Sequence, residues 1–119
     1  MAVPLKHNTF AKIKPMNLQQ DEWWAKAQED SNGVILDVRT ADEVNRGIIP
    51  GALNIDIYKG QGFIDEIEKL DKSKNYYVYC AAGARSGNAC NVMNQLGFET
   101  AYNLTGGISQ WRGPVVQPE

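Results

Sequence analysis

One short segment of the sequence combines residue types suited to sulfur chemistry: Cys80-Ala81-Ala82-Gly83-Ala84-Arg85-Ser86. Its cysteine ends the run Tyr76-Tyr77-Val78-Tyr79-Cys80, which is aromatic and β-branched and therefore predicts a buried strand. The apolar residues that follow the segment recur at helical spacing. A cysteine between a strand end and a helix start faces the unpaired N–H groups of the first helical turn, which favour an anion. The sequence therefore predicts that Cys80 is a reactive thiolate.

The six residues after Cys80 suit an anion-binding loop. Ala81, Ala82, Gly83 and Ala84 carry almost no side-chain bulk, so the backbone can curl around the sulfur and direct amides at it. Arg85 can bring a permanent charge to an anion over the sulfur, and Ser86 can cap the helix or donate a hydrogen bond to the thiolate. Such settings lower a thiol pKa from about 8.5 to roughly 3.5–7.5. The simpler alternative is a small apolar residue in the core, but the composition of the loop favours a functional cysteine.

Strand-like and helix-like patterns alternate along the chain. Strands are predicted at 10–14, 34–38, 52–55, 76–80 and 99–103. Helices are predicted at 18–29 with Asn17 as its cap, 41–46 with Thr40 and Glu43 as a capping box, 63–70, a segment that ends near Gly97, and 106–111. The alternation predicts an α/β fold with a mostly parallel central sheet of about five strands, flanked by helices. In such sheets ligands bind beyond the carboxyl ends of the strands, where Cys80 is placed.

Composition limits the classes of partner. The chain has 119 residues, a net charge of −2 and a pI near 5.4, so no broad basic surface is available for nucleic acid or an anionic membrane. No apolar run is long enough for a secretory signal or a membrane span, which predicts a cytoplasmic protein. We expect a loose arm over residues 1–9 and a single domain over 10–119. The two cysteines form no disulfide framework, and no metal site is expected.

Three groups of residues, in the same order along the chain, resemble motifs of the rhodanese family. The loop is similar to the C-x-x-G-x-R-S form of single-domain rhodaneses. Asp37-Val38-Arg39, Glu43, Gly47 to Ala52 and Asn54-Ile55 look like its D-V-R…E-F…G-H-I-P-G-A…N-I segment. Leu96-Gly97-Phe98, Leu104 to Ile108 and Trp111 look like its L-G-F…L-x-G-G-x-x-x-W ending. The resemblance covers roughly residues 10 to 112, with Ile48 in place of the usual histidine and Val44 in place of a common aromatic residue.

The resemblance implies a rhodanese-like three-layer fold and a sulfurtransferase without a metal or cofactor. Sulfane sulfur would pass from thiosulfate or a persulfide donor through a Cys80 persulfide to a thiol or to cyanide. The partners would be a small-molecule donor and a thiol acceptor, with a protein as a further option for the acceptor, and the chain a monomer or weak homodimer. Arg85 is the only cation in the loop, so we expect weak use of thiosulfate and a preference for less charged persulfide donors.

Three alternatives remain open at this stage. The chain could be a persulfide carrier, or a non-enzymatic interaction module that keeps the fold. Cysteine-dependent phosphatases and arsenate reductases use the longer C-x-x-x-x-x-R loop, whereas four residues separate Cys80 from Arg85 here. Asp37 and Arg39 are expected to brace the strand end rather than to react. Cys90 is interpreted as a buried helix position, with a resolving thiol as its alternative.

Overall fold

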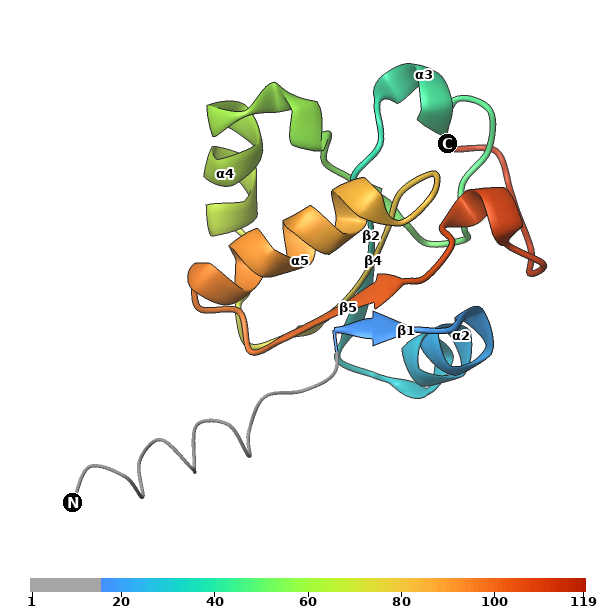
Figure 1. Ribbon diagram of the computed structural model, residues 1–119, viewed down its shortest axis with the longest axis horizontal. Helices are drawn as coiled ribbons and strands as arrows, with labels where there is room; N and C mark the ends of the chain where they lie inside the picture. Colours follow the sequence, from blue (N-terminus) through green and yellow to red (C-terminus); the bar gives the residue numbers. More distant parts are fainter. Residues whose placement is uncertain (1–15) are drawn as a thin grey trace.

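The centre of the structure is a sheet of five parallel strands in the order β1-β5-β4-β2-β3 (Figure 1). The computed structural model describes residues 16–119. Its strands are β1 (Asn17–Leu18), β2 (Gly33–Asp37), β3 (Leu53–Asn54), β4 (Asn75–Tyr79) and β5 (Thr100–Leu104). The predicted α/β class and parallel sheet are therefore confirmed.

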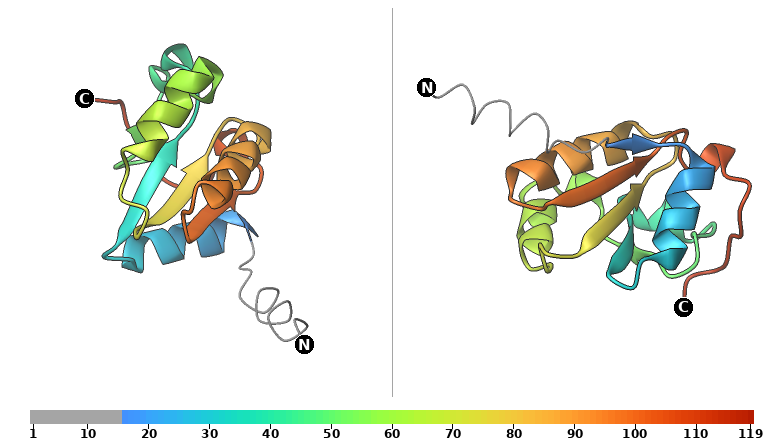
Figure 2. Two further views of the ribbon diagram at one scale, coloured as in Figure 1. Left: turned by 90° about the vertical axis from the view of Figure 1, so that its left-hand side faces the viewer. Right: turned by 90° about the horizontal axis from the view of Figure 1, so that it is seen from below.

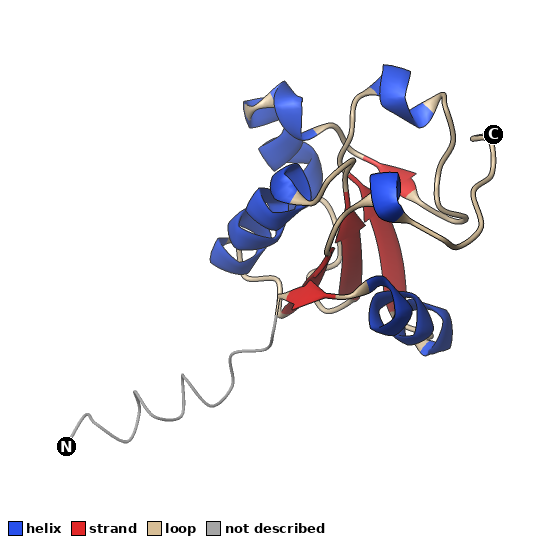
Figure 3. Cartoon of the chain, turned by 45° about the vertical axis from the view of Figure 1, so that its right-hand side comes forward, coloured by secondary structure: helices blue, strands red, loops and turns tan. Residues whose placement is uncertain are grey.

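Helices cover both faces of this sheet and make the fold three-layered (Figure 3). The α-helices are α2 (Gln20–Glu29), α3 (Ala41–Val44), α4 (Gln61–Glu68) and α5 (Ala84–Gln95). Two short 3₁₀ helices complete the set, η1 (Ile57–Lys59) and η2 (Ile108–Gln110). None of the helices among residues 16–119 is both long and apolar enough to cross a bilayer.

The alternation of side chains along β4 decides which residues face which layer. Tyr77 and Tyr79 point to the α2 side, where Trp23 is fully buried and meets each tyrosine ring edge-on at 6.1 Å. Val78 and Cys80 point to the opposite side, into the core formed with α4 and α5. Cys80 therefore faces the first turn of α5 because of its position in the strand register.

The strands that carry the site end at the same edge of the sheet. β2 and β4 run side by side in parallel register, with Asp37 opposite Tyr79 (Figure 2). The segment after Asp37 leads into α3, and the segment after Tyr79 leads into α5. Residues far apart in the sequence, from 37–43 and from 80–86, consequently meet beyond the carboxyl ends of the two strands.

The amino-terminal part of the described chain differs from the sequence prediction. Asn17 and Leu18 form β1 rather than the cap and first residue of a helix, and the residue before α2 is Gln19, whose side chain forms no capping bond. The reason is pairing with β5, which places Asn17 opposite Asn103 and directs its side chain to accept from the Asn103 amide. The predicted strand at 10–14 and the predicted arm at 1–9 lie outside the described residues.

The structure confirms the predicted capping box at residues 40–43, but it contains a shorter helix than the one predicted at 106–111. The capping box at α3 is present, with Thr40 accepting from the Glu43 backbone and the Glu43 carboxylate accepting from the Thr40 backbone. The last helix is shorter than the predicted 106–111 and is the 3₁₀ turn η2. Gly107 has a φ of 61° and leaves the helical region, which delays the start of this turn.

Candidate active site

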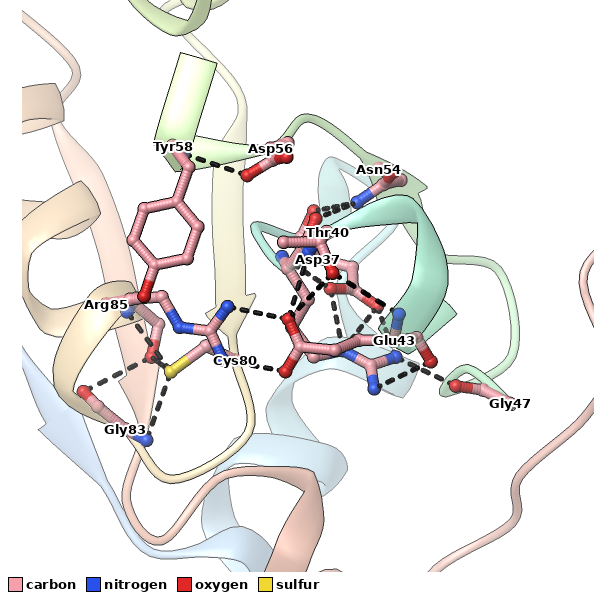
Figure 4. A network of polar contacts seen from close by, with 12 residues as sticks. Asp37, Thr40, Glu43, Gly47, Asn54, Asp56, Tyr58, Cys80, Gly83 and Arg85 are labelled. Atoms are coloured by element: carbon pink, nitrogen blue, oxygen red, sulfur yellow. Dashed lines mark hydrogen bonds and ion pairs between the residues drawn. The ribbon is translucent and has the colours of Figure 1, made fainter. Parts of the chain in front are cut away.

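The loop between β4 and α5 wraps around the sulfur of Cys80. The backbone N–H of Gly83 donates to Sγ at 3.1 Å (Figure 4). The backbone N–H of Ser86 also donates to it, at 3.4 Å. Gly83 has a φ of 106°, a conformation that favours glycine, and this turn brings the two amides together. The predicted nest of amides is thus present around Cys80, built from the first turn of α5 and the residues before it.

Burial and hydrogen bonding act in opposite directions on the Cys80 thiol, which is 1% exposed. Burial raises its pKa, because it disfavours the charged form. The Ser86 hydroxyl and the backbone N–H groups of Ser86, Gly83 and Ala82 lower it, and the net result is a pKa below the ordinary value for cysteine. The site therefore favours a thiolate even though the sulfur is almost completely covered.

Ser86 does not cap α5. The helix begins after Gly83, which forms no side-chain cap, and the Ser86 hydroxyl lies one turn into the helix. It lies 3.3 Å from Cys80 Sγ and 3.3 Å from the Gly83 carbonyl oxygen, and it forms a short hydrogen bond with Asn103 Oδ1. Of the two roles predicted for Ser86, contact with the sulfur is the one that the geometry contains.

The guanidinium of Arg85 is directed at Glu43 rather than over the sulfur. Its two terminal nitrogens reach the two carboxylate oxygens of Glu43 at 2.7 and 2.8 Å, and its other side covers the ring of Tyr58 at 5.3 Å (Figure 4). The hydrogen bonds from Arg85 lower the Glu43 pKa to about 2, so this carboxylate stays charged at neutral pH. Arg85 is thus neutralised locally, which the sequence analysis did not foresee.

Glu43 is held in place by the capping box at the start of α3. Besides the backbone bonds, the Thr40 hydroxyl donates to the same carboxylate oxygen at 3.1 Å. The helix is only one turn long, and Val44 is its buried residue. A local helix signal therefore also positions the partner of the loop arginine, because the carboxylate that closes the box is the one that Arg85 reaches.

Asp37 and Arg39 form a buried ion pair at the end of β2, with Arg39 Nη2 at 2.7 Å from Asp37 Oδ2. The same nitrogen donates to the Gly47 carbonyl oxygen at 2.8 Å, and the Asn54 amide donates to the carbonyl oxygens of Asp37 and Arg39 at 2.9 and 3.0 Å. These bonds join β2, the α3 segment and β3. Neither charged group contacts Cys80, so the geometry is that of a brace for the segment that carries Glu43.

The turn after β5 supports the loop from a third direction. The N–H groups of Ile108 and Ser109 donate to the carbonyl oxygens of Cys80 and Ala81, both at 2.9 Å. A Cβ atom on Gly107 would overlap these two carbonyl groups. A glycine is therefore required at 107 by close backbone approach, which gives a structural reason for the second glycine of the L-x-G-G motif.

Cys90 lies on α5 and is fully buried. Burial, together with the nearby Cys80 charge, raises its pKa to about 12. Within residues 16–119 no cluster of three or more histidine, cysteine or carboxylate side chains is arranged to hold a metal ion. The surroundings of Cys90 are those of a core residue, as the sequence interpretation expected.

Sequence reasoning missed two contributors to this region, Asn103 and Tyr58. Asn103 is 5% exposed in β5, and its amide links β1, the loop and Ser86. The available signal was an asparagine inside a predicted strand, because asparagine is depleted in strands and a buried polar group needs partners. Tyr58 is 70% exposed and carried no signal, since its contact with Arg85 depends on the path of the chain around η1.

Comparison with known proteins identifies a family that this chain matches. The family profile described as Rhodanese-like domain matches residues 20–114. Two relatives are named as sulfurtransferases. YtwF of Bacillus subtilis is 39% identical over 89 residues, 74% of this chain and 82% of its own length. A protein of Allochromatium vinosum is 37% identical over 94 residues, 76% of this chain and 85% of its own length.

Solved structures agree with the sequence comparisons. The crystal structure of a rhodanese-like domain protein from Staphylococcus aureus superposes with a TM-score of 0.75 at 28% identity, and the match covers 87% of this chain and 99% of that one. A rhodanese-related protein from Thermoplasma volcanium superposes with a TM-score of 0.73 at 29% identity, with 85% and 97% covered.

Proposed function

This chain belongs to the rhodanese-like domain family, and from that premise we propose that it is a sulfurtransferase whose Cys80 carries sulfane sulfur as a persulfide. The observation that carries the proposal is the ring of donors around one sulfur. Gly83 N–H, Ser86 N–H and the Ser86 hydroxyl all lie within 3.4 Å of Cys80 Sγ. Donors of this kind stabilise a thiolate, the form of cysteine that attacks a sulfur–sulfur bond.

In the first step the Cys80 thiolate attacks the outer sulfur of the donor. A bond forms between Sγ and that sulfur, and the donor's own bond to it breaks. The donor remainder leaves with the electron pair, as sulfite from thiosulfate or as a thiolate from a persulfide. Cys80 then carries an outer sulfur with the negative charge, and the same inward-facing amides are available to it.

In the second step an acceptor thiolate or cyanide attacks the outer sulfur. The Sγ–S bond breaks, its electron pair returns to Cys80, and the product leaves as a new persulfide or as thiocyanate. Two half-reactions through one covalent intermediate predict ping-pong kinetics. No electrons are gained or lost overall, so the cycle requires no redox cofactor.

The surroundings of Arg85 support a donor of low charge. Glu43 occupies both arms of the guanidinium and stays ionised, so the only cation of the loop is already paired. A thiosulfate dianion would meet the Glu43 carboxylate as well as Arg85, whereas a persulfide of a small thiol places less charge there. We therefore expect a higher kcat/KM for glutathione persulfide than for thiosulfate, and a clear preference for thiosulfate would refute this assignment.

The first test of the proposal is the intact mass of the protein after incubation with a sulfane-sulfur donor. Wild type should gain the mass of one sulfur, cyanide should remove it, and Cys80→Ser should gain nothing. Cys90→Ser is the matched control, since it removes the other thiol and should load normally. Loading without turnover on small acceptors would indicate a persulfide carrier. The absence of loading with thiosulfate, glutathione persulfide and polysulfide would favour a non-enzymatic module.

A further inference from the structure

The hydroxyl of Ser86 has one proton and three acceptors within reach. The Cys80 sulfur and the Gly83 carbonyl oxygen each lie 3.3 Å away, and Asn103 Oδ1 lies closest. A hydroxyl carries a single proton and donates one hydrogen bond at a time, so it can satisfy only one of these acceptors. Ser86 is fully buried, so its hydroxyl proton is donated to one of these protein acceptors rather than to water.

The orientation of the Asn103 carboxamide follows from its other contacts. Its Nδ2 lies 2.9 Å from Asn17 Oδ1 and 3.2 Å from the Gly83 carbonyl oxygen. Because a carbonyl oxygen can only accept, the nitrogen must face Gly83, and the carbonyl oxygen of the amide must face Ser86. The Gly83 oxygen also accepts from the Gly87 N–H at 3.1 Å, so it has two donors without Ser86. The contest for the hydroxyl proton is then between Asn103 and Cys80.

We propose that Asn103 is a positioning residue whose carboxamide oxygen competes with the Cys80 sulfur for the hydroxyl proton of Ser86. While Cys80 is a thiol, Ser86 donates to Asn103 Oδ1 and accepts from the S–H group. When the thiol proton leaves to solvent, the hydroxyl rotates and donates to the charged sulfur, because hydrogen bonds to charged acceptors are the stronger ones. Asn103 Oδ1 then loses its donor in a buried place, which makes the thiolate less stable than it would be beside an uncontested serine.

This competition changes during the transfer cycle, and the inference in that respect rests on the proposed role of Cys80. After loading, the Sγ–S bond has formed, the donor's bond has broken, and the charge lies on the outer sulfur. The Ser86 proton is then free to return to Asn103. The unloaded thiolate is therefore destabilised by the hydrogen bond that Asn103 Oδ1 loses, whereas the loaded state is not. Asn103 thus shifts the equilibrium toward the loaded state and makes the thiolate more basic and more nucleophilic.

Other charged and titratable groups near Cys80 have hydrogen-bond partners other than the Asn103 side chain or lie apart from it. Among the described residues they include Arg85 with its partner Glu43 and the buried thiol of Cys90 on α5. The ion pair of Asp37 and Arg39 lies at the end of the neighbouring strand. None of these five groups forms a hydrogen bond with the Asn103 side chain, so a change in the Cys80 titration can be traced through Ser86.

The decisive experiment is the Cys80 thiol pKa in Asn103→Ala, measured by thiolate ultraviolet absorbance and by the pH dependence of iodoacetamide alkylation. We expect a pKa lower by about one pH unit, because the Ser86 hydroxyl can then donate to the thiolate without breaking a hydrogen bond to Asn103. A merely structural role would move the pKa upward, since a loosened loop directs its amides at the sulfur less well. An unchanged or higher pKa would overturn the proposal.

A double-mutant comparison tests the route of the effect. With Ser86→Ala as the background there is no hydroxyl proton to contest, so adding Asn103→Ala should leave the thiol pKa unchanged. A shift of the single-mutant size in that background would show that Asn103 acts by another path. Asn17→Ala is the matched control, because it removes a bond to Nδ2 and leaves the Ser86 contact intact; we expect the wild-type pKa there.

A measurement on wild type covers the case in which Asn103→Ala fails to fold. With labelled asparagine, the Asn103 side-chain carbonyl resonance should shift with the same midpoint as the Cys80 absorbance, and the shift should be absent in Cys80→Ser. If the chemical shift of this carbonyl does not change over the pH range in which Cys80 titrates, the proposal is contradicted. Where Asn103→Ala folds, its loading rate above the thiol pKa should fall about threefold, as expected for a less basic thiolate. The pKa and resonance measurements need no sulfur donor, so they are independent of whether the protein transfers sulfur.

Discussion

The two cysteines of this protein lie on the same side of the sheet but in opposite electrostatic settings. Cys80 and Cys90 are both buried, with exposed fractions of 1% and 0%, and both belong to the core packed by α4 and α5. The pKa of Cys80 is nevertheless lowered, while that of Cys90 is raised to about 12. Burial opposes the thiolate in both cases.

The difference between the two regions is the supply of free N–H groups. The first turn of α5 has backbone donors with no partner inside the helix, and Gly83 and Ser86 direct theirs at Cys80. Cys90 lies further along the helix, where the N–H groups are used in the helix itself. Whether a buried thiol of this protein has a lowered or a raised pKa therefore depends on the donors around it, since both thiols are almost completely covered.

The largest effect should come from exchanging the two thiols separately for hydroxyls. Cys80→Ser should reduce sulfur transfer to the uncatalysed background, because the nucleophile is lost. Cys90→Ser should keep kcat within about twofold and lower stability by roughly 1 kcal/mol, the scale of a small change in a packed core. Thiocyanate formation and thermal unfolding measure both. Equal loss of activity in the two variants would contradict the distinction drawn between them.

Ser86→Ala sharpens the comparison by making the surroundings of Cys80 more like those of Cys90. We expect the Cys80 pKa to rise by about one pH unit, because the thiolate loses its side-chain donor. Loading at a pH below the new pKa should be slowed about tenfold and recover as the pH is raised. The rate of alkylation against pH gives the pKa directly. A rate lowered equally at every pH would instead point to a misplaced loop.

The raised pKa of Cys90 should make the free energy of unfolding depend on pH. Its pKa is about 12 in the folded protein and about 8.5 when unfolded, so above pH 8.5 the unfolded chain has released a proton that the folded chain retains. Stability from this group is complete below the unfolded pKa and is lost as the pH rises toward the folded value. Between pH 8.5 and 10 we expect a loss of about 1 to 2 kcal/mol.

Denaturant unfolding of wild type and Cys90→Ala at several pH values measures this loss. The variant should lack the decline assigned to Cys90, although it starts from a lower stability at neutral pH. The window stops at pH 10 because the buried tyrosines Tyr77 and Tyr79 also have raised pKa values and contribute above it. Parallel curves for the two proteins would show that Cys90 is not the source.

The smallest effect is expected from freeing Arg85. Glu43→Gln keeps a side chain that can close the capping box but removes the charge that pairs with Arg85. We expect the Cys80 pKa to fall by a few tenths of a pH unit while that of Cys90 is unchanged, since Arg85 lies beside the loop. The kcat/KM for thiosulfate should rise about threefold relative to glutathione persulfide. An unchanged ratio would show that Glu43 does not determine the preference between the two donors.

Much of this site was predictable because its elements are local. The strand before Cys80, the small residues after it and the Thr40–Glu43 capping box each depend on a few consecutive residues, and all are present. The prediction was wrong at Asn17, where a local helix cap competed with a partner strand that lies more than eighty residues further along the chain. Local signals of similar strength cannot decide such a contest, because the energy of strand pairing comes from the other strand.

The sequence alone determined the fold class, the succession of strands and α-helices along the chain from β2 to β5, and the presence of a cysteine where a helix supplies free amides. Those features depend on periodicity and on residues that are neighbours in the chain. Only the tertiary structure decided the partners of the polar side chains: Glu43 on Arg85, and Asn103 on Ser86. These pairs join the ends of different strands, so they form only when the parallel sheet brings those ends to one edge.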